Sequence, residues 1–180
     1  MANPVDLSGS VRFDLQSGTV RLFDDEKGLV VPASVLAALV KAAPADARAR
    51  VARDLGAYLG RSLAKRGVSI LEASLEDAAT ALAAQLALAG LGTCNLERWG
   101  KALIVHVMDS PVDDATFMSH VIEGALSAAT ARALYCTVLT GDGGIRVLVA
   151  SERGVLRVRG WIEQGTSWSD ALVRLQSGGS

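Results

Sequence analysis

The segment from Ser74 to Pro111 constrains the fold of this 180-residue chain more than any other. Ser74 followed by Asp77 resembles a capping box at the start of an Ala- and Leu-rich helix, and Gly90 suits the left-handed residue that ends such a helix. After this break, the strand expected over 100–111 is apolar on both faces, which is typical of a strand covered on both sides. The segment therefore predicts a helix packed on a sheet with a central strand, and it carries no catalytic signature.

The apolar content favours one compact domain over residues 1–180. The chain is 50% hydrophobic but only 4% aromatic, so we expect a core of Ala, Leu and Val with a modest internal pocket. A chain of this size buries roughly 70% of its unfolded surface, enough for a core without disulfides. Lys plus Arg number 18 and Asp plus Glu number 19, without a separate basic stripe, so nucleic acid is not an expected partner.

The cysteines and the first residues favour the cytoplasm. Cys94 and Cys136 are too few for a secreted disulfide framework, and the sequence starts without the basic and apolar regions of a signal peptide. The longest apolar run, residues 78–91, is shorter than the roughly 20 residues that cross a bilayer. We therefore expect a cytoplasmic protein without membrane insertion.

Periodicity elsewhere predicts further elements. Apolar residues alternate on either side of a turn at residues 11–22, which predicts a β-hairpin. Further strands, closing as a meander, are expected over residues 134–140, 145–150 and 155–162. Helices are expected over residues 32–43, 45–66 and 113–132, with a last one from Trp168. This order predicts the α+β class, with helices packed against one antiparallel sheet.

Two glycines, Gly56 and Gly60, lie four residues apart on the helix expected over 45–66. Each costs about 1 kcal/mol relative to Ala in an exposed helix, so the close approach of another backbone element is a reason for both. Tolerated sequence variation is the alternative explanation.

The Cys and His residues do not form a metal-binding pattern. They are Cys94, Cys136, His106 and His120, and they lack the closely spaced pairs of a structural zinc site. Cys94 is expected in a loop, whereas His106 is expected within a strand as a packed or hydrogen-bonded histidine. We therefore expect no metal and no cofactor.

Serine and glycine motifs also point away from catalysis. Ser110 lacks the Gly-x-Ser-x-Gly elbow of a hydrolase nucleophile and precedes Pro111, so a turn explains it. The segment 141–144 lacks the Lys-Ser/Thr of a phosphate-binding loop and is expected to form a hairpin turn. No residue pattern supports an enzyme.

The tryptophans are open to two explanations, a contact surface or core packing. They are Trp99, Trp161 and Trp168. On the strand expected over 155–162, Arg157 and Arg159 share one face with Trp161. The sequence therefore predicts a contact surface formed by this tryptophan and the two arginines.

Four short segments occur in an order typical of one known family. They are Leu29–Pro32, Leu55–Gly60, Gly90–Gly92 and Val121–Ser127. Together with the hairpin before them and the strands after them, they resemble the 4-vinyl reductase domain family, which is related in fold to the small subunits of the TRAPP vesicle-tethering complexes. The likeness covers about residues 10–150. It implies an α+β homodimer that binds small apolar or aromatic molecules or acts as an assembly module.

The chain departs from this family near its closing strands. Several members carry cysteines there that look like metal ligands, but Cys136 has no second cysteine at 143–147 to accompany it. The expected strand over 155–162 and the helix from Trp168 extend beyond the resemblance and suggest an added interaction surface.

The resemblance implies a non-enzymatic module that binds a small apolar or aromatic ligand between helices and sheet. The residues expected nearest this pocket are Tyr58, His106, Met108, Phe117, Met118 and Cys136. The alternative is a protein–protein interaction or scaffold module of the TRAPP type, which works without a ligand through homodimerisation. Its expected surface comprises Trp99, Arg157, Arg159, Trp161 and Trp168.

Overall fold

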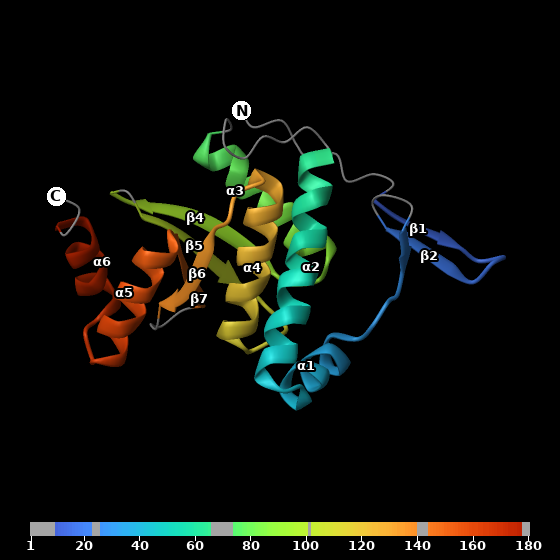
Figure 1. Ribbon diagram of the computed structural model, residues 1–180. Helices are drawn as coiled ribbons and strands as arrows, with labels where there is room; N and C mark the ends of the chain where they lie inside the picture. The colour runs from blue at the N-terminus through green and yellow to red at the C-terminus, as the bar shows by residue number, and fades with distance from the viewer. Residues whose placement is uncertain (1–9, 23–25, 66–73, 101, 140–143, 178–180) are drawn as a thin grey trace.

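The body of the molecule is built around a four-stranded antiparallel sheet (Figure 1). The computed structural model describes residues 10–22, 26–65, 74–100, 102–139 and 144–177. In order across the sheet, the strands are β4 (Thr93–Trp99), β5 (Ala102–Met108), β7 (Ile145–Ala150) and β6 (Tyr135–Leu139). The expected α+β class, with helices on an antiparallel sheet, is confirmed.

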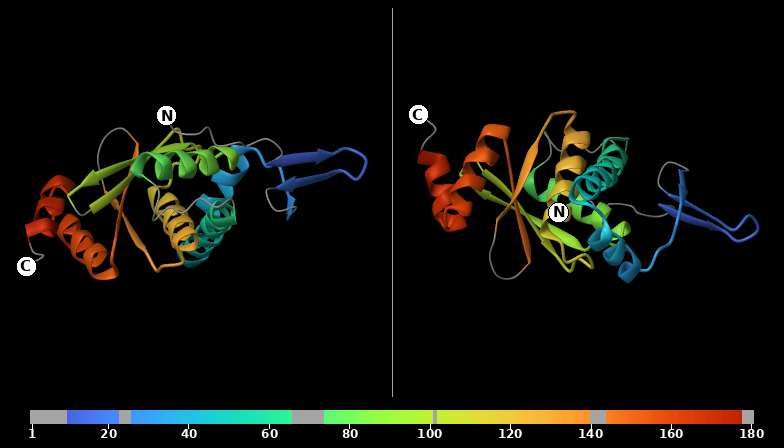
Figure 2. Two further views of the ribbon diagram at one scale, coloured as in Figure 1. Left: turned by 90° about the horizontal axis from the view of Figure 1, so that it is seen from above. Right: turned by 60° about the horizontal axis from the view of Figure 1, so that its bottom comes forward.

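Helices cover both faces of this sheet (Figure 2). On one side lie α2 (Ala45–Lys65), α3 (Leu75–Leu88) and α4 (Ala115–Thr130), and α2 packs along α4. On the other side lie α5 (Glu152–Glu163) and α6 (Trp168–Ser177). Each side has its own hydrophobic core. No helix in the described part of the chain combines the length and apolar character needed to cross a membrane.

The central strand β5 contributes to both cores, as its two apolar faces predicted. Val105 and Val107 are buried on the side of α2, α3 and α4, whereas Ile104 is buried on the side of α5 and α6. β5 pairs with β4 along one edge and with β7 along the other. The expectation of a central strand here is confirmed.

The strand β4 lies where a loop was expected around Cys94. It pairs with β5 along its whole length and buries Cys94. Gly100 has a φ of 60°, a left-handed conformation that suits the tight connection between β4 and β5. Polar residues interrupt the apolar alternation of this segment, so the strand depends on its pairing with β5 rather than on local pattern.

Residues 155–162 form most of the helix α5, and the strand expected there is wrong. Ser151 is the N-cap, and its hydroxyl accepts a hydrogen bond from the Gly154 N–H at 3.3 Å. Val155 and Val158 are buried, three residues apart, as on one face of a helix. The capping serine and this spacing outweigh the short apolar alternation, so no third strand follows β7.

The close approach expected at Gly56 and Gly60 is confirmed. A Cβ atom at Gly56 would overlap the carbonyl oxygen of Val121, and one at Gly60 would overlap that of Ala125. On the facing helix, a Cβ atom at Gly124 would overlap the backbone of α2. The two helices therefore pack backbone to backbone, which allows short side-chain contacts between α2 and α4.

The N-terminal strands form a second sheet, so the single sheet expected from the sequence is wrong. The strands are β1 (Val11–Asp14), β2 (Thr19–Leu22) and β3 (Glu26–Gly28), and α1 (Ala33–Ala42) follows them. β1 and β2 pair as the expected hairpin. This sheet projects from the body in Figure 1, and Phe13 on its apolar face is 64% exposed.

Most predicted signals at helix ends and turns are found. The Ser74 hydroxyl accepts a hydrogen bond from the Asp77 N–H at 3.1 Å, and Gly90 has a φ of 67° just after α3. β6 and β7 pair antiparallel, as expected of a hairpin. Residues 66 and 140–143, which include two expected element ends and most of the expected turn, lie outside the described residues.

Candidate functional site

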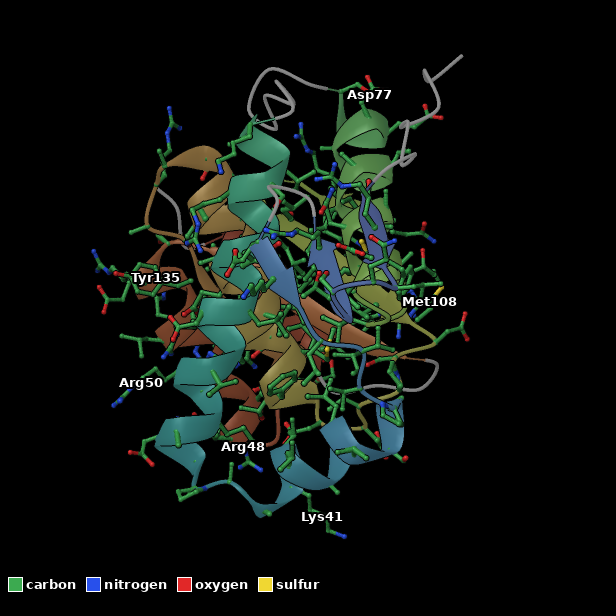
Figure 3. The ribbon with its side chains drawn as sticks, turned by 90° about the vertical axis from the view of Figure 1, so that its right-hand side faces the viewer. Lys41, Arg48, Arg50, Asp77, Met108 and Tyr135 are labelled. Carbon is green, nitrogen blue, oxygen red and sulfur yellow. The ribbon has the colours of Figure 1, made fainter. Side chains whose placement is uncertain are left out.

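A cavity of about 730 Å³ opens at the free edge of the sheet, along β6. Four lining residues come from β6, four from α4 on one side of the sheet and four from α5 on the other, and Arg53 of α2 completes the lining. We refer to it as the edge cavity. Tyr135, one of its lining residues, is labelled on the left of the view in Figure 3.

The edge strand exposes backbone groups to this cavity. β6 pairs with β7 alone, so every second residue directs its N–H and C=O groups away from the sheet. Cys136 is one of these residues, and its N–H donates a hydrogen bond to Glu123 Oε2 of α4 at 3.0 Å. Because a free edge favours pairing with other chains, this carboxylate protects part of β6.

Glu123 also forms an ion pair with α2. Arg53 Nε donates to Glu123 Oε1 at 2.6 Å, and the Glu123 side chain is only 14% exposed. Both carboxylate oxygens are therefore bound by donors of the protein. Arg53 and Glu123 also line a shallower groove of about 530 Å³ along α2 and α4. The ion pair therefore lies between this groove and the edge cavity.

His120 lies one turn before Glu123 on the cavity wall of α4. Its Nδ1 is 4.0 Å from Glu123 Oε1, too far for a hydrogen bond, and has no hydrogen-bond partner among the described residues. Burial, followed by the positive charge of Arg53, lowers the pKa of His120 below its usual value of 6.5, although Glu123 opposes the shift. The imidazole is therefore neutral at pH 7.

The cysteine thiols are unsuited to nucleophilic chemistry. Burial raises the pKa of Cys94 to about 12. Burial, and then the negative charge of Glu123, raise the pKa of the Cys136 thiol. Both are free cysteines, protonated at neutral pH. Within the described residues, no group of three or more His, Cys, Asp or Glu side chains could hold a metal ion.

The wall contributed by α5 combines apolar side chains with the guanidinium group of Arg159. Val155 and Leu156 line the edge cavity beside Val138 of β6. Arg159 lies one turn further along α5, and among the described residues no carboxylate lies within ion-pair distance of it. The cavity therefore has an apolar surface next to a guanidinium group that no carboxylate of the described residues pairs with.

The structure separates most of the residues expected near a pocket. Phe117 and Met118 are at most 1% exposed in the core, and the partly buried Tyr58 packs against that core. His106 and Met108 lie on the opposite face of β5 from Val105 and Val107, and Figure 3 shows Met108 on the side of the molecule away from Tyr135. Of these six residues, Cys136 lines the edge cavity.

The residues expected at a contact surface are also divided. Trp99 and Trp168 form an edge-to-face pair with ring centroids 5.3 Å apart. The guanidinium of Arg157 lies 5.1 Å from the ring centroid of Trp161. Arg159, two residues from Arg157 on a helix, points to nearly the opposite side and lines the edge cavity. The helical geometry of α5 therefore overturns the shared face expected for these arginines.

Arg53, His120 and Glu123 were not predicted to belong to the site. One signal was present: Glu123 is the only charged residue within the stretch 121–126, whose other residues are apolar and buried in α4. A charge in such a place needs a partner. The sequence does not reveal that this partner is Arg53, because the two lie 70 positions apart.

Comparisons with known proteins show a shared fold. Neither a protein-family model nor a curated protein matches the sequence. Among solved structures, the chain is similar to the phenol-responsive sensory domain of the transcription activator PoxR, determined with phenol. The two share 17% sequence identity with a TM-score of 0.57, and the match covers 79% of this chain and 85% of that domain. The chain therefore has the kind of fold found in a small sensory domain.

Proposed function

We propose that this chain is a non-enzymatic module that binds a small apolar or aromatic molecule in the edge cavity. The main observation behind this proposal is the size of the cavity. Its volume of about 730 Å³ lies within the range of roughly 300–1,000 Å³ that is common for small-molecule sites. The fold similarity to a phenol-responsive sensory domain supports it.

The lining suits binding better than catalysis. Val138, Val155 and Leu156 provide apolar contacts, while hydroxyl and imidazole groups of α4 offer a few polar anchors. Both oxygens of Glu123 are occupied by Arg53 and the Cys136 N–H, so this carboxylate is poorly placed to accept a proton from a substrate.

Thermal denaturation with added ligands tests this proposal. We expect phenol, other substituted benzenes or short fatty acids to raise the melting temperature by about 5 °C or more when present at 100 times the dissociation constant. Leu156→Asp, at the cavity wall, should abolish the shift. Val173→Asp is the matched control, because both side chains are 58% exposed and Val173 lies outside the cavity on α6.

Two results would contradict the proposal. One is a melting temperature unchanged by every compound at millimolar concentration. The other is a shift that persists in Leu156→Asp, because it would place the bound molecule elsewhere.

We propose self-association as a second function, in line with a homodimeric interaction module. The observation that favours it is the apolar face of the N-terminal sheet, formed by Val11, Phe13, Val20 and Leu22. These strands pack mainly on one another, and an isolated small sheet is marginally stable without a covered apolar face. A second copy of the chain would cover it.

Sedimentation velocity tests the association. We expect a dimer at micromolar concentration and a monomer for Phe13→Asp, with Val173→Asp as the control that remains dimeric. A monomeric unmodified chain would refute this second function and leave ligand binding unaffected.

A further inference from the structure

The charged side chains that line the edge cavity are not equally available to a ligand, and this difference indicates a class of ligand. Four acidic or basic side chains besides His120 line the cavity: Arg53, Glu123, Glu152 and Arg159. Arg53 and Glu123 neutralise each other at 2.6 Å. The second oxygen of Glu123 is bound to the Cys136 N–H at 3.0 Å. The charges that remain for a ligand are therefore those of Glu152 and Arg159.

Glu152 and Arg159 differ in their surroundings. Glu152 is exposed in the first turn of α5, where the helix dipole stabilises a carboxylate without any ligand. Arg159 lies nearly two turns further on and has no carboxylate within ion-pair distance among the described residues. It follows the apolar Val155 and Leu156 by four and three residues, so all three share one side of the helix.

We propose that the edge cavity prefers a small aromatic carboxylate, with its ring on Val155 and Leu156 and its carboxylate on Arg159. This inference rests on the proposed ligand-binding function and names the ligand class of that site. A guanidinium group can donate two parallel hydrogen bonds to a carboxylate, which fixes the orientation of the bound molecule. Along α5, Arg159 lies about one helical turn, roughly 5 Å, beyond Val155 and Leu156.

The opposite wall is compatible with an acidic ligand. His120, Ser119 and Thr116 of α4 carry no negative charge, so they do not repel a carboxylate. The Ser119 hydroxyl donates to the Thr116 carbonyl at 2.8 Å, so its proton is not available to a ligand carboxylate. Arg159 is therefore the group that selects an acid over a neutral analogue.

Isothermal titration of the full chain with benzoate, benzamide and phenol at pH 7.5 tests the preference. Benzamide is the neutral analogue of benzoate with nearly the same shape. We expect benzoate to bind about tenfold or more tightly than benzamide. Arg159→Gln should remove this preference, Arg159→Lys should retain part of it, and Arg157→Gln should retain all of it. Arg157 serves as the control because it lies on the other side of α5, over Trp161.

The outcomes separate this inference from the function on which it rests. If phenol or benzamide binds as tightly as benzoate, or if Arg159→Gln keeps the preference, the carboxylate assignment is refuted while ligand binding stands. If none of the three compounds binds, both are refuted. Because Arg159 is exposed, we expect its variants to keep the melting temperature of the unmodified chain. An unchanged melting temperature would show that a variant that no longer binds is still folded.

Discussion

At the scale of single residues, Glu123 joins three elements of the fold. Its carboxylate accepts from Arg53 of α2 and from the backbone N–H of Cys136 in β6. We expect Glu123→Ala to lower the free energy of unfolding by about 1–3 kcal/mol, because it leaves a backbone donor without an acceptor. Urea denaturation followed by circular dichroism measures this change.

Glu123→Gln separates the hydrogen bond from the charge. The amide oxygen of the variant can still accept from the Cys136 N–H, so its loss of stability should be smaller than that of Glu123→Ala. Equal losses in the two variants would show that the ion pair with Arg53, rather than protection of the strand edge, is the main contribution.

His120 should make stability depend on pH. Its pKa in the folded chain is lowered, first by burial and then by Arg53, from the value of 6.5 that an unfolded chain has. As pH falls below 6.5, the unfolded state takes up the proton first, so stability is lost from there down to the folded pKa. We expect the melting temperature to fall between pH 7.5 and 5.5, and less steeply in His120→Gln. Parallel curves for the two proteins would contradict this.

At the scale of elements, the contact between α2 and α4 depends on glycine. A Cβ atom at Gly56 would overlap the Val121 carbonyl oxygen, so Gly56→Ala should lower the free energy of unfolding by about 1–3 kcal/mol despite the better helix propensity of alanine. Gly160 of α5 is the matched control, because a Cβ atom there has no neighbour within 4 Å.

Gly160→Ala should raise stability by about 0.5–1 kcal/mol, since only the helix propensity changes. Chemical denaturation of both variants gives the comparison. A Gly56→Ala chain that is as stable as Gly160→Ala would show that the helices separate at little cost.

Local pattern predicted the elements whose signals lie within a few residues. Ser74 and Gly90 marked the ends of α3, and the apolar faces of β5 marked a central strand. The pattern failed at 155–162, where a short apolar alternation suggested a strand but the Ser151 cap and the buried Val155 and Val158 produce a helix. Strand β4 was missed because its stability comes from pairing with β5, which lies outside any local window.

At the scale of the whole molecule, the edge cavity could not be predicted from spacing. Arg53, Glu123, Cys136 and Arg159 come from four elements, and only the packing of α2 on α4 and the placement of β6 at a sheet edge bring them together. Of the six residues expected at a pocket, Phe117 and Met118 fill the core and Tyr58 packs against it, whereas only Cys136 lines the edge cavity. A charged residue inside an apolar helix face, Glu123, was the informative signal.

The C-terminal helices α5 and α6 complete the fold, because they cover the second face of the sheet. Leu172 of α6 is 0% exposed and belongs to the core that covers Ile104 and Leu148 of the sheet. We expect Leu172→Ala to lower the free energy of unfolding by about 2–5 kcal/mol, because it removes buried methyl groups and leaves a cavity. Val173, its neighbour, is 58% exposed, so Val173→Ala should change stability by less than about 0.5 kcal/mol. Urea denaturation of both variants measures this difference. If Leu172→Ala is as stable as Val173→Ala, the packing of α6 on the sheet adds little to stability. A large difference would show that the two faces of the sheet unfold as one cooperative unit.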